Sequence, residues 1–161
     1  MTDWERYNLD QLAIGENRSW ILSVRSIQIT LGSCRILTKR RVERLSELSN
    51  REAVDLRDMV RAFEDLLTGC FQPARFNYVI SGQHGVMSRE QDPLLHLHAF
   101  PRYNRNVYWR NRDWVDRRWP KFLRFPEVSE NPIAELRSLR TLLRDEAVGR
   151  RLLEKHDQRR L

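Results

Sequence analysis

Residues 92–103 read Asp92-Pro93-Leu94-Leu95-His96-Leu97-His98-Ala99-Phe100-Pro101-Arg102-Tyr103. Two histidines stand two residues apart in an apolar run with a proline on either side. In a β-strand, residues at i and i+2 point to the same face of the sheet. We therefore predict a strand with His96 and His98 on one face, in line with Leu94. The opposite face, which carries Leu95, Leu97 and Ala99, is predicted to face a core.

The size and composition of the chain indicate a single soluble domain. It has 161 residues, of which 40% are hydrophobic and 32% are charged, a mixture typical of globular proteins. No apolar run approaches the roughly 18 residues of a membrane helix, and residues 1–6 do not resemble a signal peptide. We expect a cytoplasmic protein without membrane contact. We divide it into a loosely held lead-in (1–18), a main domain (19–125), and a C-terminal helix with a charged tail (126–161).

The net charge of +7 is carried almost entirely by arginine. Arginine binds phosphate through a planar pair of donors, so an anionic partner is one explanation of this charge. The other is an arginine-rich solvated surface, and charge alone does not separate the two. The two cysteines, Cys34 and Cys70, belong to no metal-binding cluster and are predicted to be free apolar side chains.

Strands and helices can be placed on either side of the histidines. Alternating and β-branched residues predict strands at 19–24, 34–38 and 75–81. Residues 26–31 either continue the first strand or connect it to the second. The short connections favour an antiparallel sheet, and therefore an α+β fold.

Two helices are predicted by their capping signals. Ser49 and Glu52 form a capping box ahead of an apolar stripe at helical spacing, and Gly69 is predicted to end that helix. A C-terminal helix is predicted to start with Asn131 as N-cap and Pro132 as its first residue.

The paired histidines allow three kinds of chemistry. They could supply two ligands to a metal, with His84 as a third, although the sequence places no carboxylate convincingly beside them. They could be satisfied structural histidines on a half-buried strand. They could also act on phosphorus: a neutral imidazole attacks a phosphoryl group, and a second imidazole stabilises the developing charge. The residues alone leave these alternatives open.

The histidine stretch resembles the signature of the histidine triad (HIT) family of nucleotide hydrolases and transferases, which reads His-φ-His-φ-His-φ-φ and is commonly followed by Pro-Arg. Further similarity lies in Thr30-Leu31-Gly32-Ser33, Asn77-Tyr78 and Asp92-Pro93. These motifs look most like the bacterial diadenosine polyphosphate hydrolase-like branch, and the resemblance covers about residues 19–103.

This resemblance implies a fold and a mechanism. The fold is α+β, a HIT-like five-stranded antiparallel sheet with one long helix, to which we add the C-terminal helix; such proteins usually form homodimers. His96 would be the nucleophile that attacks the α-phosphate of a dinucleoside polyphosphate or nucleoside phosphoramidate, giving a nucleotidyl-histidine intermediate. His98 would contact the phosphate and manage protons, and no metal or other cofactor is required. The expected substrate-binding residues are Gln83, Asn77, Ser81, Arg102 and Gln28.

The sequence departs from the family pattern at two supporting positions. Leu94 replaces the first histidine of the triad, and Ser33 stands where many members have another histidine. The alternative function is therefore a catalytically weak nucleotide- or nucleic-acid-binding protein with an incomplete triad. In that case residues 104–125, rich in Arg and Trp, would supply a surface for nucleic acid. We favour instead the packing of these tryptophans against the sheet or in a dimer interface.

Overall fold

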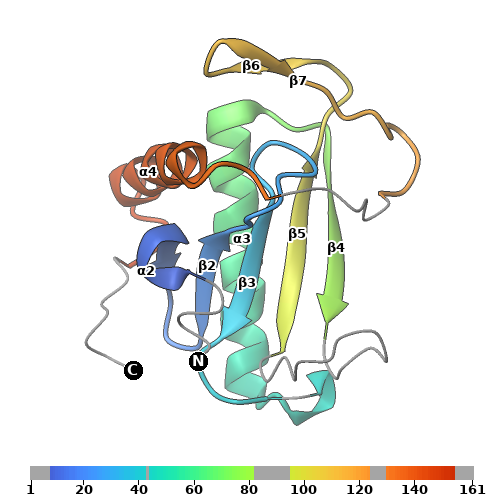
Figure 1. Cartoon of the computed structure of the whole chain (residues 1–161). Helices are drawn as coiled ribbons and strands as arrows, with labels where there is room; N and C mark the ends of the chain where they lie inside the picture. The colour runs from blue at the N-terminus through green and yellow to red at the C-terminus, as the bar shows by residue number, and fades with distance from the viewer. Residues whose placement is uncertain (1–7, 43, 82–94, 124–129, 155–161) are drawn as a thin grey trace.

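A five-stranded antiparallel sheet with the order β1-β2-β3-β5-β4 organises the structure, a computed structural model that describes residues 8–42, 44–81, 95–123 and 130–154 (Figure 1). A two-stranded hairpin, β6–β7, stands apart from this sheet. The elements are α2 (Leu9–Leu12), β1 (Ala13–Glu16), β2 (Trp20–Val24), β3 (Cys34–Thr38), the short 3-10 helix η1 (Leu45–Glu47), α3 (Asn50–Phe71), β4 (Arg75–Ser81), β5 (His96–Arg102), β6 (Val107–Trp109), β7 (Arg112–Trp114) and α4 (Ile133–Gly149). The predicted α+β class and five-stranded sheet are confirmed.

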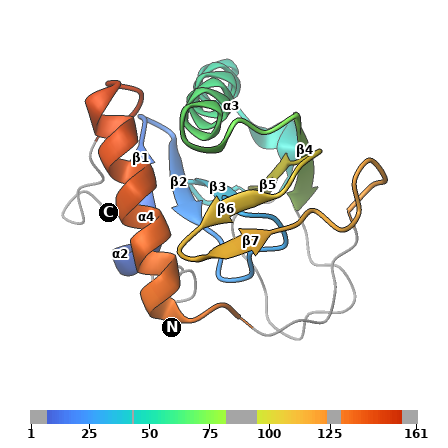
Figure 2. The same cartoon turned by 90° about the horizontal axis from the view of Figure 1, so that it is seen from above.

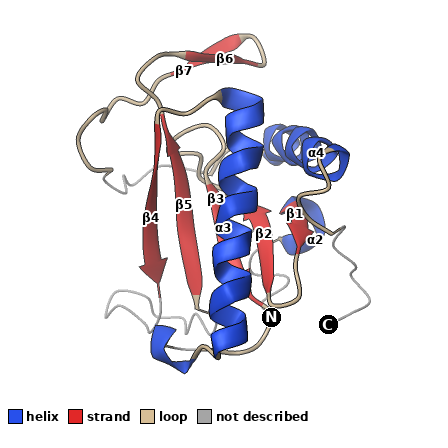
Figure 3. Ribbon diagram, turned by 180° about the vertical axis from the view of Figure 1, so that it is seen from behind, coloured by secondary structure: helices blue, strands red, loops and turns tan. Residues whose placement is uncertain are grey.

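Helix α3 covers one face of the sheet and closes the hydrophobic core (Figure 3). Leu95, Leu97 and Ala99 of β5 belong to this core, as their alternation predicts. The ring of Phe63 on α3 is fully buried against the β4 rings of Phe76 and Tyr78. Burial of each such large side chain stabilises the fold by about 1.5–3 kcal/mol. The core thus holds the face of β5 that packs against α3. The opposite face of β5 carries the polar side chains.

The predicted capping box starts α3. The Ser49 hydroxyl accepts from the Glu52 backbone N–H at 3.2 Å, and the Glu52 carboxylate accepts from the Ser49 N–H at 2.8 Å. The predicted end of the helix is wrong, because α3 continues past Gly69 to Phe71 and Gln72 adopts the left-handed conformation (φ 51°). The guanidinium of Arg150, the flexible end of its side chain, lies against α3 at Gly69.

The first strand of the sheet was not foreseen. Residues 13–16 form β1, which pairs with β2 and is fully buried, so the expectation of a loosely held lead-in is wrong for this stretch. Glu16 is buried within a salt bridge to Lys39 (2.7 Å). The backbones of Glu16 and Glu154 form an antiparallel β-bridge on the free side of β1. The C-terminal segment therefore protects part of this edge strand.

Residues 25–33 connect β2 to β3 as a loop rather than as more strand. Gly32 has φ +86°, and a Cβ there would lie 2.4 Å from a Leu67 methyl group, so both conformation and space require glycine. The Asn131 side chain does not cap α4; it accepts from the Gln28 N–H at 2.9 Å, and Pro132 precedes the first helical residue. The start of α4 is thereby tied to this loop.

The β6–β7 hairpin lies over the end of the sheet at which β5 finishes, and α4 runs beside β1 (Figure 2). Leu136, Leu139 and Leu143 of α4 are buried in the common core. None of the helices in the described ranges is both long enough and apolar enough to span a membrane.

Candidate active site

The two histidines lie on β5, between β3 and the edge strand β4, and alternate with Leu97 and Ala99 of the core, which places them on the face opposite α3. Strand register places Arg35 of β3 and Val79 of β4 directly beside His98. Leu37 and Ser81 flank His96 in the same way. Directly paired residues of neighbouring antiparallel strands share a face, so the side chains of Arg35, Val79 and Leu37 lie on the same face as the two histidines.

The two imidazoles are in hydrogen-bonding contact. His96 Nε2 and His98 Nε2 are 3.2 Å apart, and the rings meet edge to face with centroids 4.7 Å apart. His96 is 4% exposed, while His98 is half-buried. One Nε2 must donate and the other accept, so at least one ring keeps an unprotonated Nε2. This is the atom that a nucleophilic imidazole uses.

The surroundings keep His98 neutral. Burial lowers the pKa of His98 to about 2, and the charges of Arg25, His96 and Arg35 add to this effect. Burial, with repulsion from Arg35, lowers the pKa of Arg25 to about 10, so this guanidinium remains charged at neutral pH. The result is a neutral His98 next to two positively charged side chains.

Phe100 connects Arg25 to the histidines. The Phe100 ring stacks on that of His98 with centroids 6.2 Å apart, and the Arg25 guanidinium carbon lies 5.2 Å from the Phe100 centroid. A cation at this distance from a ring face is attracted to it. Arg25 is therefore positioned next to the site by the aromatic ring as well as by its backbone.

Solved structures with this architecture include proteins that are named as histidine triad proteins. A hypothetical histidine triad nucleotide-binding protein from Sulfolobus tokodaii matches with a TM-score of 0.64 at 14% identity, over 91% of this chain and 90% of that one. The fold is that of the histidine triad proteins.

Other histidine triad structures agree with this. Plasmodium falciparum diadenosine triphosphate hydrolase matches with a TM-score of 0.59 at 13% identity, over 86% of this chain and 78% of that one. The Caenorhabditis elegans NitFhit protein matches with a TM-score of 0.60 at 17% identity over 84% of this chain, which spans only 27% of that protein's length. No protein-family model matches the sequence, and no curated protein is significantly similar to it.

Within this histidine triad fold, Arg102 and Asn77 contact each other. The Arg102 guanidinium donates to the Asn77 side-chain oxygen, to the carbonyl of Lys121 at 2.8 Å, and to Asp116 at 2.6 Å. The side chains of Arg102 and Asp116 are each 1% exposed. Both predicted substrate-binding residues thus contribute to a buried polar cluster at the end of β5. Asp116 could not be predicted from local sequence patterns, because it lies in a segment without periodicity.

Gln28, another predicted substrate-binding residue, uses its side-chain amide inside its own loop. Its Nε2 donates to the carbonyls of Arg25 and Ser33 (2.7 and 2.8 Å), and its Oε1 accepts from the Gly32 N–H at 2.9 Å. These bonds hold the backbone of Arg25 in place. Ser81 is placed beside His96 by its backbone alone. Gln83, His84 and Leu94 lie outside the described residues.

The arginine- and tryptophan-rich segment packs on the protein itself. Trp109 and Trp114 are half-buried against the main core, with centroids 6.2 Å apart. The Arg75 guanidinium lies 4.7 Å from the centroid of Trp119. These contacts fit the packing interpretation of the aromatic residues. Within the described residues, no group of three or more His, Cys, Asp or Glu side chains could hold a metal ion.

Proposed function

We propose that this protein is a nucleotide hydrolase or nucleotidyl transferase that acts on the α-phosphate of a nucleotide conjugate. The conjugate is a dinucleoside polyphosphate, as in the diadenosine polyphosphate hydrolase-like branch, or a nucleoside phosphoramidate. The observation that carries the proposal is the 3.2 Å contact between His96 Nε2 and His98 Nε2 on the polar face of the sheet. A cytoplasmic location and a homodimer remain predictions.

His96 is assigned as the nucleophile. In the tautomer that the reaction requires, His96 Nε2 is unprotonated, and its single lone pair accepts from His98 Nε2–H in the free enzyme. When substrate binds, the His98 Nε2–H donates instead to a phosphoryl oxygen, which frees that lone pair. That lone pair attacks the α-phosphorus and forms a P–N bond. The P–O or P–N bond to the leaving group breaks, and the leaving group departs with the bonding electron pair. Covalent catalysis of this kind divides one displacement into two easier steps.

His98 is assigned to the phosphate and its protons. As the P–N bond forms at His96, the His98 Nε2–H donates to a phosphoryl oxygen instead of to His96 Nε2. Arg25 and Arg35 act electrostatically on this same side of the site. Fixed positive charge stabilises the negative charge of a transferring phosphoryl group. Water then attacks phosphorus, and the P–N bond breaks. Nucleoside monophosphate is released, and His96 is regenerated.

Release of nucleoside monophosphate tests the activity. Wild type, His96→Asn and His98→Asn are incubated with diadenosine tetraphosphate and with adenosine phosphoramidate. Wild type is expected to release AMP from at least one substrate, and His96→Asn from neither. Asparagine is used because it keeps a polar side chain at this buried position, where His96 is 4% exposed.

Trapping distinguishes covalent catalysis from activation of water by His96. Substrate labelled at the α-phosphate is mixed with enzyme, and the reaction is stopped by denaturation at alkaline pH, which preserves P–N bonds. Label should remain on wild type and on His98→Asn, and be absent from His96→Asn. Equal labelling of all three proteins contradicts the proposal. So does a lack of turnover with both substrates, combined with salt-sensitive binding of nucleic acid.

A further inference from the structure

Residues 104–123 form the β6–β7 hairpin and the segment after it, which cross the end of the sheet where β5 finishes (Figure 2). They carry six positive side chains and two negative ones. Asp116 is buried in its ion pair with Arg102, and Arg112 is paired with Glu135 at 2.6 Å. The remaining positive side chains are Arg105, Arg110, Arg117, Arg118 and Lys121. They outnumber the one remaining carboxylate, Asp113, so this basic surface attracts anions.

Guanidinium groups of the basic surface are held in place without being neutralised. Arg105 donates to the carbonyl of Phe71 at 3.0 Å, and Arg110 donates to the hydroxyl of Ser138. Both acceptors are uncharged, so each guanidinium keeps its positive charge and has further N–H donors for a phosphate oxygen. A guanidinium that is already held loses less conformational freedom when it binds a phosphate.

The basic surface extends from α4 to β4. On one side, the contact between Arg110 and Ser138 joins it to α4. On the other side, the guanidinium of Arg75, the first residue of β4, lies 4.7 Å from the centroid of the Trp119 ring. An extended basic path of this kind suits a chain of phosphates better than a single small anion.

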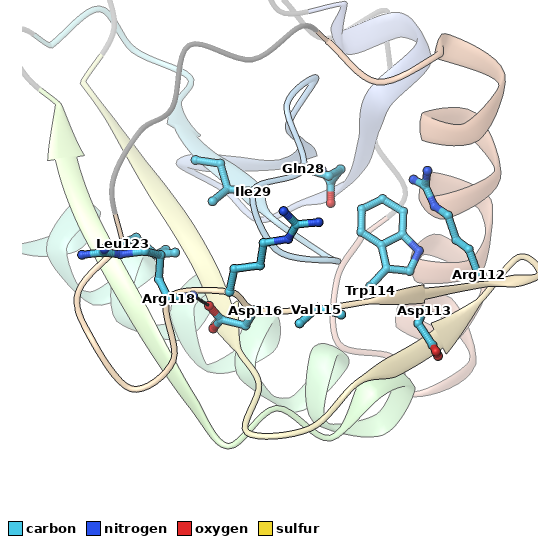
Figure 4. Close-up of a pocket in the computed structure, with 10 residues that line it drawn as sticks. Gln28, Ile29, Arg112, Asp113, Trp114, Val115, Asp116, Arg118 and Leu123 are labelled. Atoms are coloured by element: carbon cyan, nitrogen blue, oxygen red, sulfur yellow. Dashed lines mark hydrogen bonds between the residues drawn. The ribbon is translucent and has the colours of Figure 1, made fainter.

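A cavity of about 430 Å³ indents the basic surface between the loop 25–33 and the segment that follows β7 (Figure 4). Arg117 and Arg118 line it together with the apolar side chains of Val115 and Leu123. Neither histidine of β5 lines it. The basic surface is therefore grooved, and it is separate from the histidine site.

Two aromatic rings of the basic surface face the solvent. Tyr108 on β6 is 69% exposed, and Phe122 is 64% exposed. Trp109 and Trp114, by contrast, pack against the core. Packing explains these tryptophans but not the two exposed rings. Aromatic rings among positive side chains are the combination that binds single-stranded nucleic acid, because the rings stack on unpaired bases and the charges hold the phosphates.

We propose that the basic surface of residues 104–123 binds a single strand of nucleic acid. Tyr108 and Phe122 stack on unpaired bases, and the arginines hold the phosphates along the strand. A duplex fits less well, because its bases are stacked on one another and leave no face for these rings. An acidic peptide would satisfy the charges but leave both rings without partners. This binding is independent of the proposed function, because it uses neither histidine.

Fluorescence anisotropy with two matched probes tests this assignment. A labelled oligothymidylate of about 15 nucleotides and a labelled abasic strand of the same length have the same phosphates and differ only in the bases. The wild type should bind the oligothymidylate roughly tenfold more tightly, because the abasic strand offers no base for stacking. The slope of log K against log salt concentration should be about −3 to −4, as expected for about five phosphate contacts.

The two contributions to binding are removed separately. Tyr108→Ser/Phe122→Ser should bring the preference for the oligothymidylate below about twofold and leave the affinity for the abasic strand unchanged. Arg117→Gln/Lys121→Gln should weaken the binding of both probes and reduce the salt slope by about 1.4, the contribution of two phosphate contacts. These positions are all exposed, so the unfolding midpoint in urea should stay at the wild-type value.

Arg57→Gln/Arg61→Gln is the matched control. It removes the same amount of charge from exposed positions of α3, outside the basic surface, so the affinity for both probes should be unchanged. If Arg117→Gln/Lys121→Gln has no more effect than this control, the proposal is wrong, because binding would then follow the net charge of the chain.

Other results also overturn the proposal. Equal affinity of the wild type for the two probes shows that the bases are not recognised. Tighter binding of a duplex of the same length points to double-stranded nucleic acid instead. Displacement of the oligothymidylate by poly-glutamate at an equal concentration of charge points to an acidic protein partner. Because these measurements involve no turnover, none of them bears on the catalytic assignment of the histidines.

Discussion

The two ends of β5 differ in how completely their polar groups are paired. At its start, His96 and His98 bond to each other through nitrogens that can exchange donor and acceptor roles. At its end, Arg102 is enclosed by a carboxylate, a side-chain amide and a carbonyl. The histidines and Arg102 lie on the same face of the same strand, and only three residues separate His98 from Arg102.

This difference indicates a reactive role for the histidine pair and a structural role for the Arg102 cluster. A group can act on a substrate only if its lone pairs or protons can be redirected at low cost, and the histidine pair has this property. A charged group that is fully paired in the interior holds its neighbours in place instead, and it is costly to disturb. Arg102 thus fixes the segment that carries Asp116 against β5. The following predictions test this division.

The largest effect is expected at the histidine end. Replacement of His96 by asparagine removes the nucleophile and should lower the turnover number on the order of 10³- to 10⁴-fold. Because asparagine can still bond to His98, the unfolding midpoint in urea should change little. A residual rate above about one tenth of wild type would place the nucleophile elsewhere.

At the other end, Asp116→Ala should mainly affect stability. It leaves the guanidinium of Arg102 buried without its carboxylate, which typically costs about 3–5 kcal/mol in the free energy of unfolding. Urea denaturation measures the loss. The neighbouring Asp113→Ala, at an exposed position, should cost less than about 0.5 kcal/mol.

The double variant Arg102→Met/Asp116→Leu sharpens the same test. Replacing both charges by apolar side chains of similar volume should recover most of the loss. If Asp116→Ala alone costs less than about 1 kcal/mol, the ion pair does not organise this end of the strand.

The pH dependence of stability should come in part from His98. The folded protein lowers the pKa of His98 from its ordinary value of 6.5 to about 2, so between these values the unfolded state binds more protons. The free energy of unfolding therefore falls as the pH drops below 6.5. Because His98 is only partly buried, we expect a loss on the order of 1 kcal/mol from this residue between pH 7 and pH 5. His98→Gln should show a shallower acid slope in urea denaturation, and an unchanged slope would contradict the neutral assignment.

Local signals in the sequence predict the arrangement of His96 and His98 at the start of β5, but not the Arg102–Asp116 pair at its end. The period of two through residues 95–99 was enough to place the histidines on one face and the leucines in the core. The capping box at Ser49 gave the start of α3 for the same reason, since both depend on residues close in sequence. Arg102 and Asp116, by contrast, are partners fourteen residues apart. Their pairing depends on the path of an aperiodic segment, which no local pattern encodes.

The missed edge strand has a similar cause. Ala13-Ile14-Gly15-Glu16 has one strong strand former, Ile14, among alanine, glycine and glutamate, which are depleted in strands. Its strand conformation depends on pairing with β2 and on partners far along the chain, Lys39 and the backbone of Glu154. Likewise, Gln28 looked available for substrate from sequence, because the hydrogen bonds it makes within its loop become visible only in the folded chain.

The smallest effect is expected at Asn77. A variant at this position tests whether Asn77 belongs to the Arg102 cluster or to the substrate site. Its side chain accepts from Arg102, while the family resemblance implies that it binds substrate. If Asn77 belongs to the arginine end, Asn77→Ala should cost about 1 kcal/mol of stability, since Arg102 keeps its other two partners. The Michaelis constant for diadenosine tetraphosphate should then stay within twofold of wild type. A higher Michaelis constant with unchanged stability would instead extend the substrate site along β4, because the loss would then fall on binding rather than on the fold.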